Sequence, residues 1–199
     1  MALLKIARMG HPVLLARARE VADPAAPAVR RLIGSMAETL ADAGGIGLAA
    51  PQVHVPLRVI LFSVPAHRAS EDETELPVTA LINPEIEPVG EEKQLGWEGC
   101  LSIPGLRAAV PRWAKIRYRG LSPDGATVER VATGLHARVL QHEVDHLDGI
   151  LYPMRMNDFS LMAFNEEWQR YLAKRDLAAG GPPDAGPAGD ELKERQPWT

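Results

Sequence analysis

The sequence holds a single cysteine, few aromatic residues and no long apolar run. Because Cys100 is the only cysteine, an internal disulfide is excluded, and burial of apolar surface has to stabilise the fold. Aromatic residues make up 5% of the 199 residues, whereas apolar residues as a whole make up 46%. Leu, Ile, Val and Ala therefore have to fill the core. No apolar stretch reaches the length of a membrane-spanning helix, so we expect no membrane association.

Neither sign of charge dominates the chain. A total of 22 basic and 26 acidic residues gives a net charge of −4, which argues against a broad nucleic-acid-binding surface. The first 19 residues contain basic residues and no acid, as in transit peptides, but residues 10–12 (GHP) would interrupt an amphipathic helix. We therefore expect a cytoplasmic, bacterial protein, with organellar import as the disfavoured alternative.

The C-terminal residues differ in composition from the rest of the chain. Between residues 180 and 190, seven of eleven residues are Gly or Pro. Such a segment buries too little apolar surface to offset the entropy lost on ordering. The sequence predicts one folded domain over residues 1–177 and a flexible Gly/Pro-rich tail over residues 178–199.

Helical periodicity predicts three helices, separated by segments with the character of strands. The first helix is expected to begin at residues 23–24 and to end at residues 44–45, and the second is expected over residues 133–147. The third is expected to begin at residues 157–158 and to reach Leu172. Strands are predicted at residues 57–63, 78–82, 85–96, 105–121 and 128–132. Because strands and helices do not alternate regularly, we predict an α+β fold with mostly antiparallel strands.

The clearest chemical signal is the sequence HEVDH at residues 142–146. On a helix, His142 and His146 share one face, with their Cβ atoms about 5–6 Å apart. Two imidazoles in this arrangement can bind one metal ion, and Glu143 is placed to handle the proton of a metal-bound water. Leu135 and Val139 continue the same face, which supports the helical context. The motif predicts a metal site.

A catalytic site of this type has three protein ligands and one open position, so a third ligand is required. The metzincin pattern would place a histidine three residues after Gly149, but Tyr152 occupies that position. Glu166 lies at the spacing found in thermolysin-like proteases. Cys100 offers a thiolate, which is a strong ligand for zinc or ferrous iron. The residue pattern alone leaves Glu166 and Cys100 as alternatives.

Two upstream segments share features of a functional site. Cys100 lies in the sequence EGCLS at residues 98–102, beside a glycine that allows close approach of the backbone. Residues 45–52 (GIGLAAPQ) form a loop of small residues that lacks the Gly-Lys-Ser/Thr of a phosphate-binding loop. At the end of this loop, Gln52 can offer an amide N–H to a developing oxyanion.

Together, GIGLAAPQ, EGCLS and QHEVDHL (residues 141–147) resemble the three signature motifs of the peptide deformylase family, in the same order and spacing. The resemblance covers roughly residues 4–175. Residues 134–139 (GLHARV) resemble the organelle-like type 1 subgroup. The resemblance implies a peptide deformylase-like fold around a central metal-binding helix, with residues 1–177 as the catalytic domain.

The resemblance also implies a set of ligands. Cys100, His142 and His146 would bind one divalent metal ion, and Glu143 would take a proton from water and pass it to the leaving amine. Ferrous iron is the expected ion, with Zn2+, Ni2+ or Co2+ as alternatives.

Further roles follow from the same resemblance. The Gln52 side chain and the Leu101 backbone N–H would stabilise the oxyanion, while Ile46 and Gly47 would pair with an extended peptide. The methionine pocket would be formed by Ile46, Leu135 and Val139. Glu98 and Arg112 would form a supporting ion pair. The roles of Arg107 and Arg138 are left open.

The implied function is removal of the formyl group from the N-terminal formylmethionine of newly made polypeptides. The implied partners are these nascent peptides and the ribosome, with no direct nucleic-acid site. Two alternatives remain: a metallopeptidase with Glu166 as third ligand, and a catalytically silent relative that associates with the ribosome.

Overall fold

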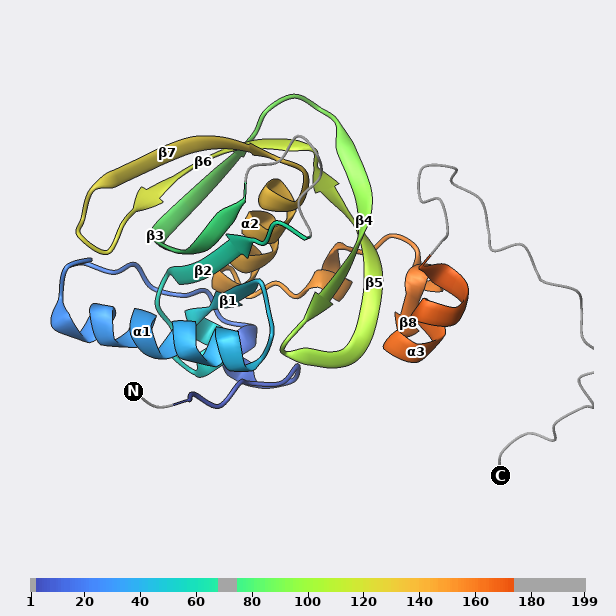
Figure 1. Ribbon diagram of the computed structural model, residues 1–199, viewed down its shortest axis with the longest axis horizontal. Helices are drawn as coiled ribbons and strands as arrows, with labels where there is room; N and C mark the ends of the chain where they lie inside the picture. The colour runs from blue at the N-terminus through green and yellow to red at the C-terminus, as the bar shows by residue number, and fades with distance from the viewer. Residues whose placement is uncertain (1–2, 68–74, 174–199) are drawn as a thin grey trace, which may run out of the picture.

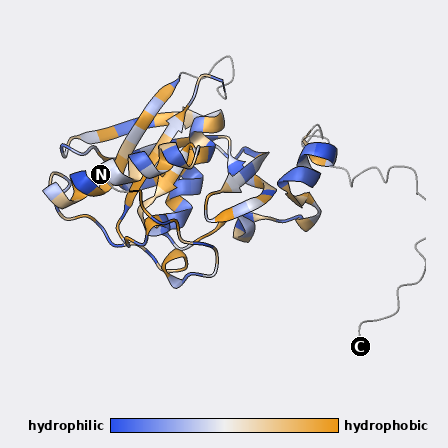
Figure 2. Ribbon diagram, turned by 60° about the horizontal axis from the view of Figure 1, so that its bottom comes forward, coloured by the Kyte–Doolittle hydropathy of each residue, from blue (hydrophilic) through white to orange (hydrophobic). Residues whose placement is uncertain are grey.

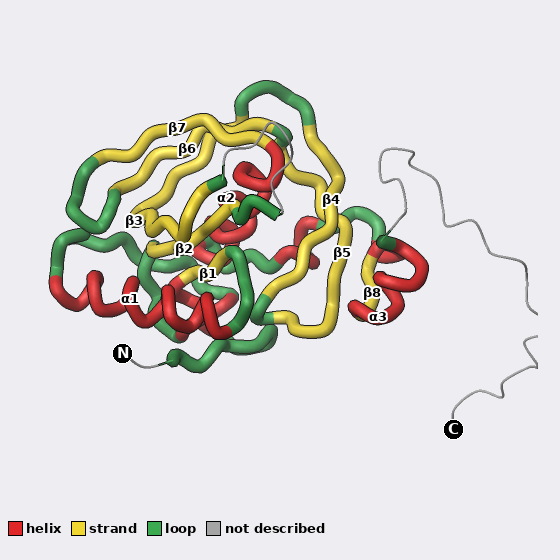
Figure 3. Tube along the Cα trace, in the orientation of Figure 1, coloured by secondary structure: helices red, strands yellow, loops and turns green. Residues whose placement is uncertain are grey.

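The computed structural model describes residues 3–67 and 75–173, so the predicted tail at residues 178–199 lies outside the described residues. The described residues form two antiparallel sheets and the helices α1 (Pro27–Asp42) and α2 (Gly134–Leu147) (Figures 1 and 3). No helix in this part of the chain is long and apolar enough to cross a membrane.

Every pair of named strands is antiparallel, which confirms the predicted α+β class. The larger sheet has the order β1-β2-β3-β6-β7 and the smaller one β4-β5-β8. The larger sheet consists of β1 (Gly47–Ala49), β2 (Val59–Val64), β3 (Leu76–Pro88), β6 (Lys115–Leu121) and β7 (Thr127–Thr133). The smaller sheet consists of β4 (Lys93–Cys100), β5 (Ile103–Trp113) and β8 (Met162–Phe164).

Strand β2 lies at the centre of the core because both of its faces are covered. Side chains on a strand alternate between faces, and Ile60 and Phe62 pack in one apolar cluster with Leu140 of α2. Val59 and Leu61 pack in a second cluster with residues of α1, among them Met36 and Leu40. All six residues of β2 are buried, whereas β6 alternates buried and exposed residues. Figure 2 shows hydrophilic and hydrophobic residues following one another along the strands.

The predicted helix over residues 133–147 is confirmed as α2, but the predicted third helix is wrong in its first half. Residues after Asp158 instead form a short 3-10 turn, η4 (Phe159–Leu161), and then strand β8, which pairs with β5. Only α3 (Asn165–Glu167) and the π-helical turn η5 (Trp168–Leu172) are helical. Backbone pairing with the β5 edge therefore overrides the helical spacing of residues 161 and 162. The remaining 3-10 turns are η1 (Pro12–Leu14), η2 (Ala50–Val53) and η3 (Tyr152–Arg155).

Two predicted boundaries also differ from the structure, and a side-chain hydrogen bond is found at each. The Asp23 side chain accepts from the Ala25 backbone N–H at 3.0 Å, which forms a turn, so α1 begins only at Pro27. Asn83 was expected to end a strand, yet β3 continues through it with a shift in register. Asn83 has a φ of 50°, and its side chain bonds both the N–H and the C=O of Val21.

Gly149, two residues after the end of α2, supplies a test of how this helix is packed. Its φ is +74°, and a Cβ atom there would lie 2.7 Å from the backbone carbonyl of Leu15. Gly149→Ala is expected to lower the free energy of unfolding by about 2–4 kcal/mol, because positive φ and overpacking both cost energy. Gly125 is the matched control, since its φ is +86° with nothing within 4 Å of the added Cβ. Gly125→Ala is expected to cost about 1–2 kcal/mol in urea unfolding; equal losses would contradict the packing argument.

Candidate metal centre and active-site pocket

Two histidines and one cysteine converge beside the middle of α2. The side chains of His142 and His146 lie one helical turn apart on one face, with their rings 5.0 Å apart between centroids. Cys100, the last residue of β4, places its Sγ atom 3.2 Å from Nε2 of His146. The three candidate ligand atoms all lie within 4.8 Å of one another, and no other such group occurs among the described residues. Glu166 is exposed on α3 and does not belong to the group.

The thiol of Cys100 is oriented by residues around it. The β4–β5 pairing shifts register between Gly99 and Cys100, at the turn of the hairpin. The Ser102 backbone N–H donates to Sγ at 3.4 Å, and Nε2 of Gln52 donates to it at 3.5 Å. The Gln52 amide is itself fixed, because its Oε1 accepts from the Ala49 N–H at 2.8 Å. The same Nε2 atom also donates to Oγ of Ser102 at 3.1 Å, so the Gln52 amide lies between the cysteine and this serine.

A buried carboxylate, Glu98, connects the hairpin to α2. It accepts hydrogen bonds from Arg112 at 2.9 Å, from Arg138 at 2.9 Å and from Nδ1 of His142 at 2.8 Å. Burial by itself would raise the pKa of Glu98, but the hydrogen bonds from Arg112 and His142 hold this pKa well below its ordinary value. Glu98 therefore stays ionised and fixes the orientation of the His142 ring. The expected Glu98–Arg112 ion pair is present.

The same network reaches the second half of the HEVDH motif. Arg112 also donates to the Asp145 carboxylate, which accepts from Arg155 at 2.7 Å as well. Asp145 directly precedes His146, and Glu98 bonds His142. The guanidinium of Arg112 therefore contacts one carboxylate beside each of the two histidines. The residue pattern gave no role to Asp145 or Arg155.

Glu143 occupies a different electrostatic environment from Glu98. It is 3% exposed, and its Oε2 atom has no hydrogen-bond partner among the described residues. Burial raises the pKa of Glu143 to about 7. A Cβ atom at Gly47 would lie only 2.1 Å from its Oε1 atom. Glycine at position 47 is therefore what allows this carboxyl group to lie against β1.

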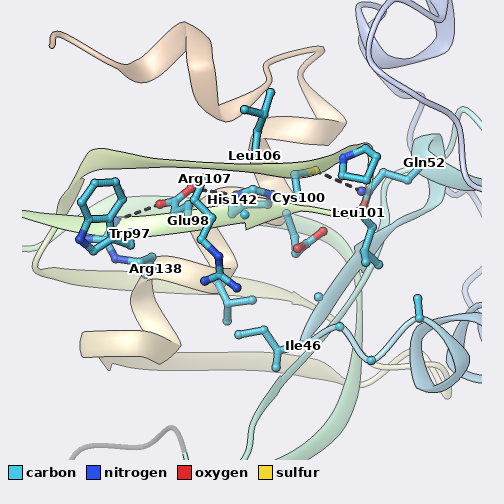
Figure 4. Close-up of a pocket in the computed structure, with 18 of the residues that line it drawn as sticks. Ile46, Gln52, Trp97, Glu98, Cys100, Leu101, Leu106, Arg107, Arg138 and His142 are labelled. Carbon is cyan, nitrogen blue, oxygen red and sulfur yellow. Dashed lines mark hydrogen bonds and ion pairs between the residues drawn. The ribbon is translucent and has the colours of Figure 1, made fainter. Parts of the chain in front are cut away.

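These residues border one pocket of about 630 Å³ (Figure 4). Of the predicted site residues, the lining includes Ile46, Gly47, Gln52, Cys100, Leu101, Leu135, Val139, His142 and Glu143. His146 does not line the pocket, and it is 1% exposed. The lining also includes residues for which no role was predicted, among them Trp97, Leu106 and Asn165. The tertiary pairing of β4, β5 and β8 brings these residues to the pocket, so no local sequence motif marks them.

The two arginines whose roles were left open both line the pocket. Arg138 is paired with Glu98 and donates to the backbone carbonyls of Gly96, Val110 and Gln94. Those contacts assign it to the support of β4 and β5. Arg107 has different partners, an amide oxygen and an indole ring.

The donor set fits a divalent transition-metal ion. A thiolate with two imidazoles is a typical combination for such ions. Because Nδ1 of His142 is engaged by Glu98, Nε2 is the nitrogen left for a metal, and a carboxylate behind a ligating histidine is common in metal sites. Cys100, His142 and His146 could therefore hold one ion together.

Removing the charge of Glu98 tests the importance of the network. Glu98→Gln is expected to lower the free energy of unfolding by about 3–5 kcal/mol, because it leaves buried guanidinium groups without their partner. Glu85→Gln is the matched control: Glu85 pairs with Arg119 at the surface, where both side chains are about 60% exposed, and should change stability by less than about 1 kcal/mol. Similar losses for both variants in chemical unfolding would show that the buried network does not stabilise the fold.

Comparison with known proteins gives a consistent result. The family model described as Polypeptide deformylase matches residues 3–161. A curated relative named Peptide deformylase 1 from Nitrosomonas europaea is 46% identical, over 81% of this chain and 92% of the relative. Another protein of that name, from Bordetella pertussis, is 48% identical over 81% and 92% of the two chains.

Solved structures agree with the sequence comparison. The class I type b peptide deformylase of Acinetobacter baumannii, with Met-Ala-Ser bound, has a TM-score of 0.72 and 37% identity, covering 78% of this chain and 99% of that one. The peptide deformylase of Ehrlichia chaffeensis in complex with actinonin has a TM-score of 0.74 and 33% identity, covering 80% and 91%.

Proposed function

We propose specific roles for the pocket residues, on the premise that this chain belongs to the polypeptide deformylase family. It is an enzyme that removes the formyl group from the N-terminal formylmethionine of newly made polypeptides and releases formate. The observation that carries the proposed roles is the convergence of Cys100, His142 and His146 beside the buried carboxyl group of Glu143.

Cys100, His142 and His146 are proposed to hold one divalent metal ion, with ferrous iron expected and Zn2+, Ni2+ or Co2+ as alternatives. When bound, such an ion lowers the pKa of water to about 7 and polarises a carbonyl group. The buried Glu98 carboxylate supports this role, because its hydrogen bond to Nδ1 fixes the orientation of the His142 ring.

Glu143 is proposed to transfer the proton. It accepts a proton from the water that attacks the formyl carbon and later gives it to the leaving amine. A group with a pKa near the working pH is suited to both steps, and burial raises the pKa of Glu143 to about 7. Its unpartnered Oε2 atom leaves it free to receive the proton.

Gln52 and the backbone N–H of Leu101 are proposed to stabilise the negative charge on the carbonyl oxygen during hydrolysis. The support for Gln52 is its fixed amide, held by the Ala49 N–H and directed toward Cys100. A donor that is oriented before the reaction does not need to reorganise as the charge develops.

The proposed substrate contacts follow from the pocket walls. Ile46, Leu135 and Val139 form an apolar surface for the methionine side chain. Gly47 lies on β1, an edge strand of the larger sheet, and an extended peptide can add to such an edge through backbone hydrogen bonds. Contact with the ribosome and a cytoplasmic location are part of the proposal, and a cysteine ligand suits a reducing compartment.

The choice between Cys100 and Glu166 as third ligand can be tested by metal analysis. Cys100→Ala is expected to lower affinity for the ion by roughly a hundredfold or more, since even the supporting residues of metal sites contribute 10–100-fold. Glu166→Ala is the control and should retain one equivalent. The reverse pattern would favour the metallopeptidase with Glu166 as a ligand.

The role of Glu143 predicts a variant that binds metal but does not turn over. Glu143→Gln preserves shape and should retain the ion, while formate release from formyl-Met-Ala falls by about 10²–10⁴-fold because the proton acceptor is lost. Glu91→Gln, at an exposed position, controls for purification and assay. Unchanged turnover in Glu143→Gln would contradict the proposed mechanism, since another residue would then have to transfer the proton.

A further inference from the structure

We propose that Tyr152 is a positioning residue for the metal centre, and that its ring holds the imidazole of His142 in its orientation. The sequence comparison with metzincins treated position 152 only as the place of a missing histidine. The inference deepens the proposed function and rests on it, because it takes His142 to be a metal ligand.

The ring of Tyr152 lies against one face of the His142 ring. The two centroids are 6.1 Å apart and the ring planes differ by 26°, an offset stacked arrangement. Glu98 bonds Nδ1 of His142 at 2.8 Å, but a single hydrogen bond lets a ring tilt about the bonded atom. An aromatic face against the imidazole limits that tilt. The contact also suits a ligand, because an imidazole that binds a divalent ion gains positive charge, which the face of a phenol ring attracts.

The turn η3, in which Tyr152 is the first residue, contacts α2 at a second place. Arg155, the last residue of η3, donates to the Asp145 carboxylate at 2.7 Å. Asp145 directly precedes His146, so the turn is attached to α2 beside both histidines. Movement of the Tyr152 ring away from His142 is therefore opposed by an ion pair three residues further along the chain.

Apolar packing surrounds the rest of the Tyr152 side chain, which is 1% exposed. It lies in one apolar cluster with Ile103 and Val110 of β5, and Cys100 packs against the same cluster. This cluster therefore supports one candidate ligand directly and another through Tyr152. Tyr152 does not line the pocket, so a peptide bound there does not touch it.

The hydroxyl group of Tyr152 is not needed for this role. Its oxygen atom is buried and has no hydrogen-bond partner among the described residues. A buried hydroxyl group without a partner costs stability, so phenylalanine at this position should be at least as stable as tyrosine. The aromatic face is the part of the side chain that acts on His142.

The test measures Co2+ binding to the full chain under anaerobic conditions, by titration against a competing chelator. Tyr152→Leu is expected to bind Co2+ about tenfold more weakly than the unmodified enzyme, the lower end of the effect of residues that support metal ligands. Its d–d absorption bands should also change, because the imidazole is held less firmly. Tyr152→Phe should bind within about twofold of the unmodified enzyme with unchanged bands, because the aromatic face is kept. Tyr152→Met gives the same comparison if Tyr152→Leu does not fold.

Tyr118 provides the matched control for the loss of a buried aromatic ring. It is 2% exposed and packs edge to face on Phe62 at 6.3 Å, in the larger sheet rather than the smaller one that carries Cys100. Tyr118→Leu should lower the urea midpoint about as much as Tyr152→Leu does, yet leave the affinity for Co2+ and the absorption bands unchanged.

Steady-state kinetics with saturating Co2+ give a second readout. In Tyr152→Leu, kcat for formate release from formyl-Met-Ala should fall about tenfold, because small displacements at a catalytic site are costly. KM should stay unchanged, since Tyr152 does not line the pocket. A rise in KM with unchanged kcat would mean that Tyr152 acts on substrate binding, which contradicts the inference.

Two results of the Co2+ titration would also overturn the inference: equal affinity in Tyr152→Leu and the unmodified enzyme, or an equal loss of affinity in Tyr152→Leu and Tyr118→Leu. A loss in Tyr152→Phe as large as in Tyr152→Leu would contradict it as well, because the hydroxyl group would then be responsible. Failure of the proposed function has a different signature, since the unmodified enzyme itself would then bind no Co2+ through Cys100 and release no formate.

Discussion

The arrangement of the site depends on one buried carboxylate, Glu98, which receives hydrogen bonds from Arg112, Arg138 and His142. It lies two residues before Cys100 on β4, so its contacts fix the cysteine and a histidine of α2 relative to each other. Arg112 extends the same network to Asp145. Taking these charges out of water is costly, and only the dense pairing offsets the cost. The two elements that carry the candidate ligands are therefore joined by charged hydrogen bonds.

Glu98 and Glu143 are both buried, yet their surroundings give them opposite properties. Glu98 has cationic partners that keep its pKa well below the ordinary value. Glu143 has an unpartnered oxygen, and burial raises its pKa to about 7. One carboxyl group is thus suited to hold the ligands, and the other to exchange a proton. The absence of a side chain at Gly47 provides the space that the second one occupies.

The sequence was most informative where function and local structure share one pattern. The HEVDH motif lies inside a helix whose boundaries were predicted almost to the residue, since periodicity and motif agree there. The residues could not choose between Cys100 and Glu166, because that choice depends on how β4 packs against α2; the family resemblance supplied it. Asn165 could not be predicted as part of the pocket, because β8 replaces part of the expected third helix, and its pairing with β5 brings Asn165 there. Local spacing carries no information about such a pairing.

We propose above all that Cys100, His142 and His146 bind one divalent ion together. Absorption spectroscopy of the full chain, titrated anaerobically with Co2+, tests it most directly, because a thiolate ligand gives the ion a sulfur-to-metal charge-transfer band. We expect a band that saturates at one equivalent and is missing in Cys100→Ser. Saturation at one equivalent with no such band would contradict it, since the ion would then be held without the cysteine.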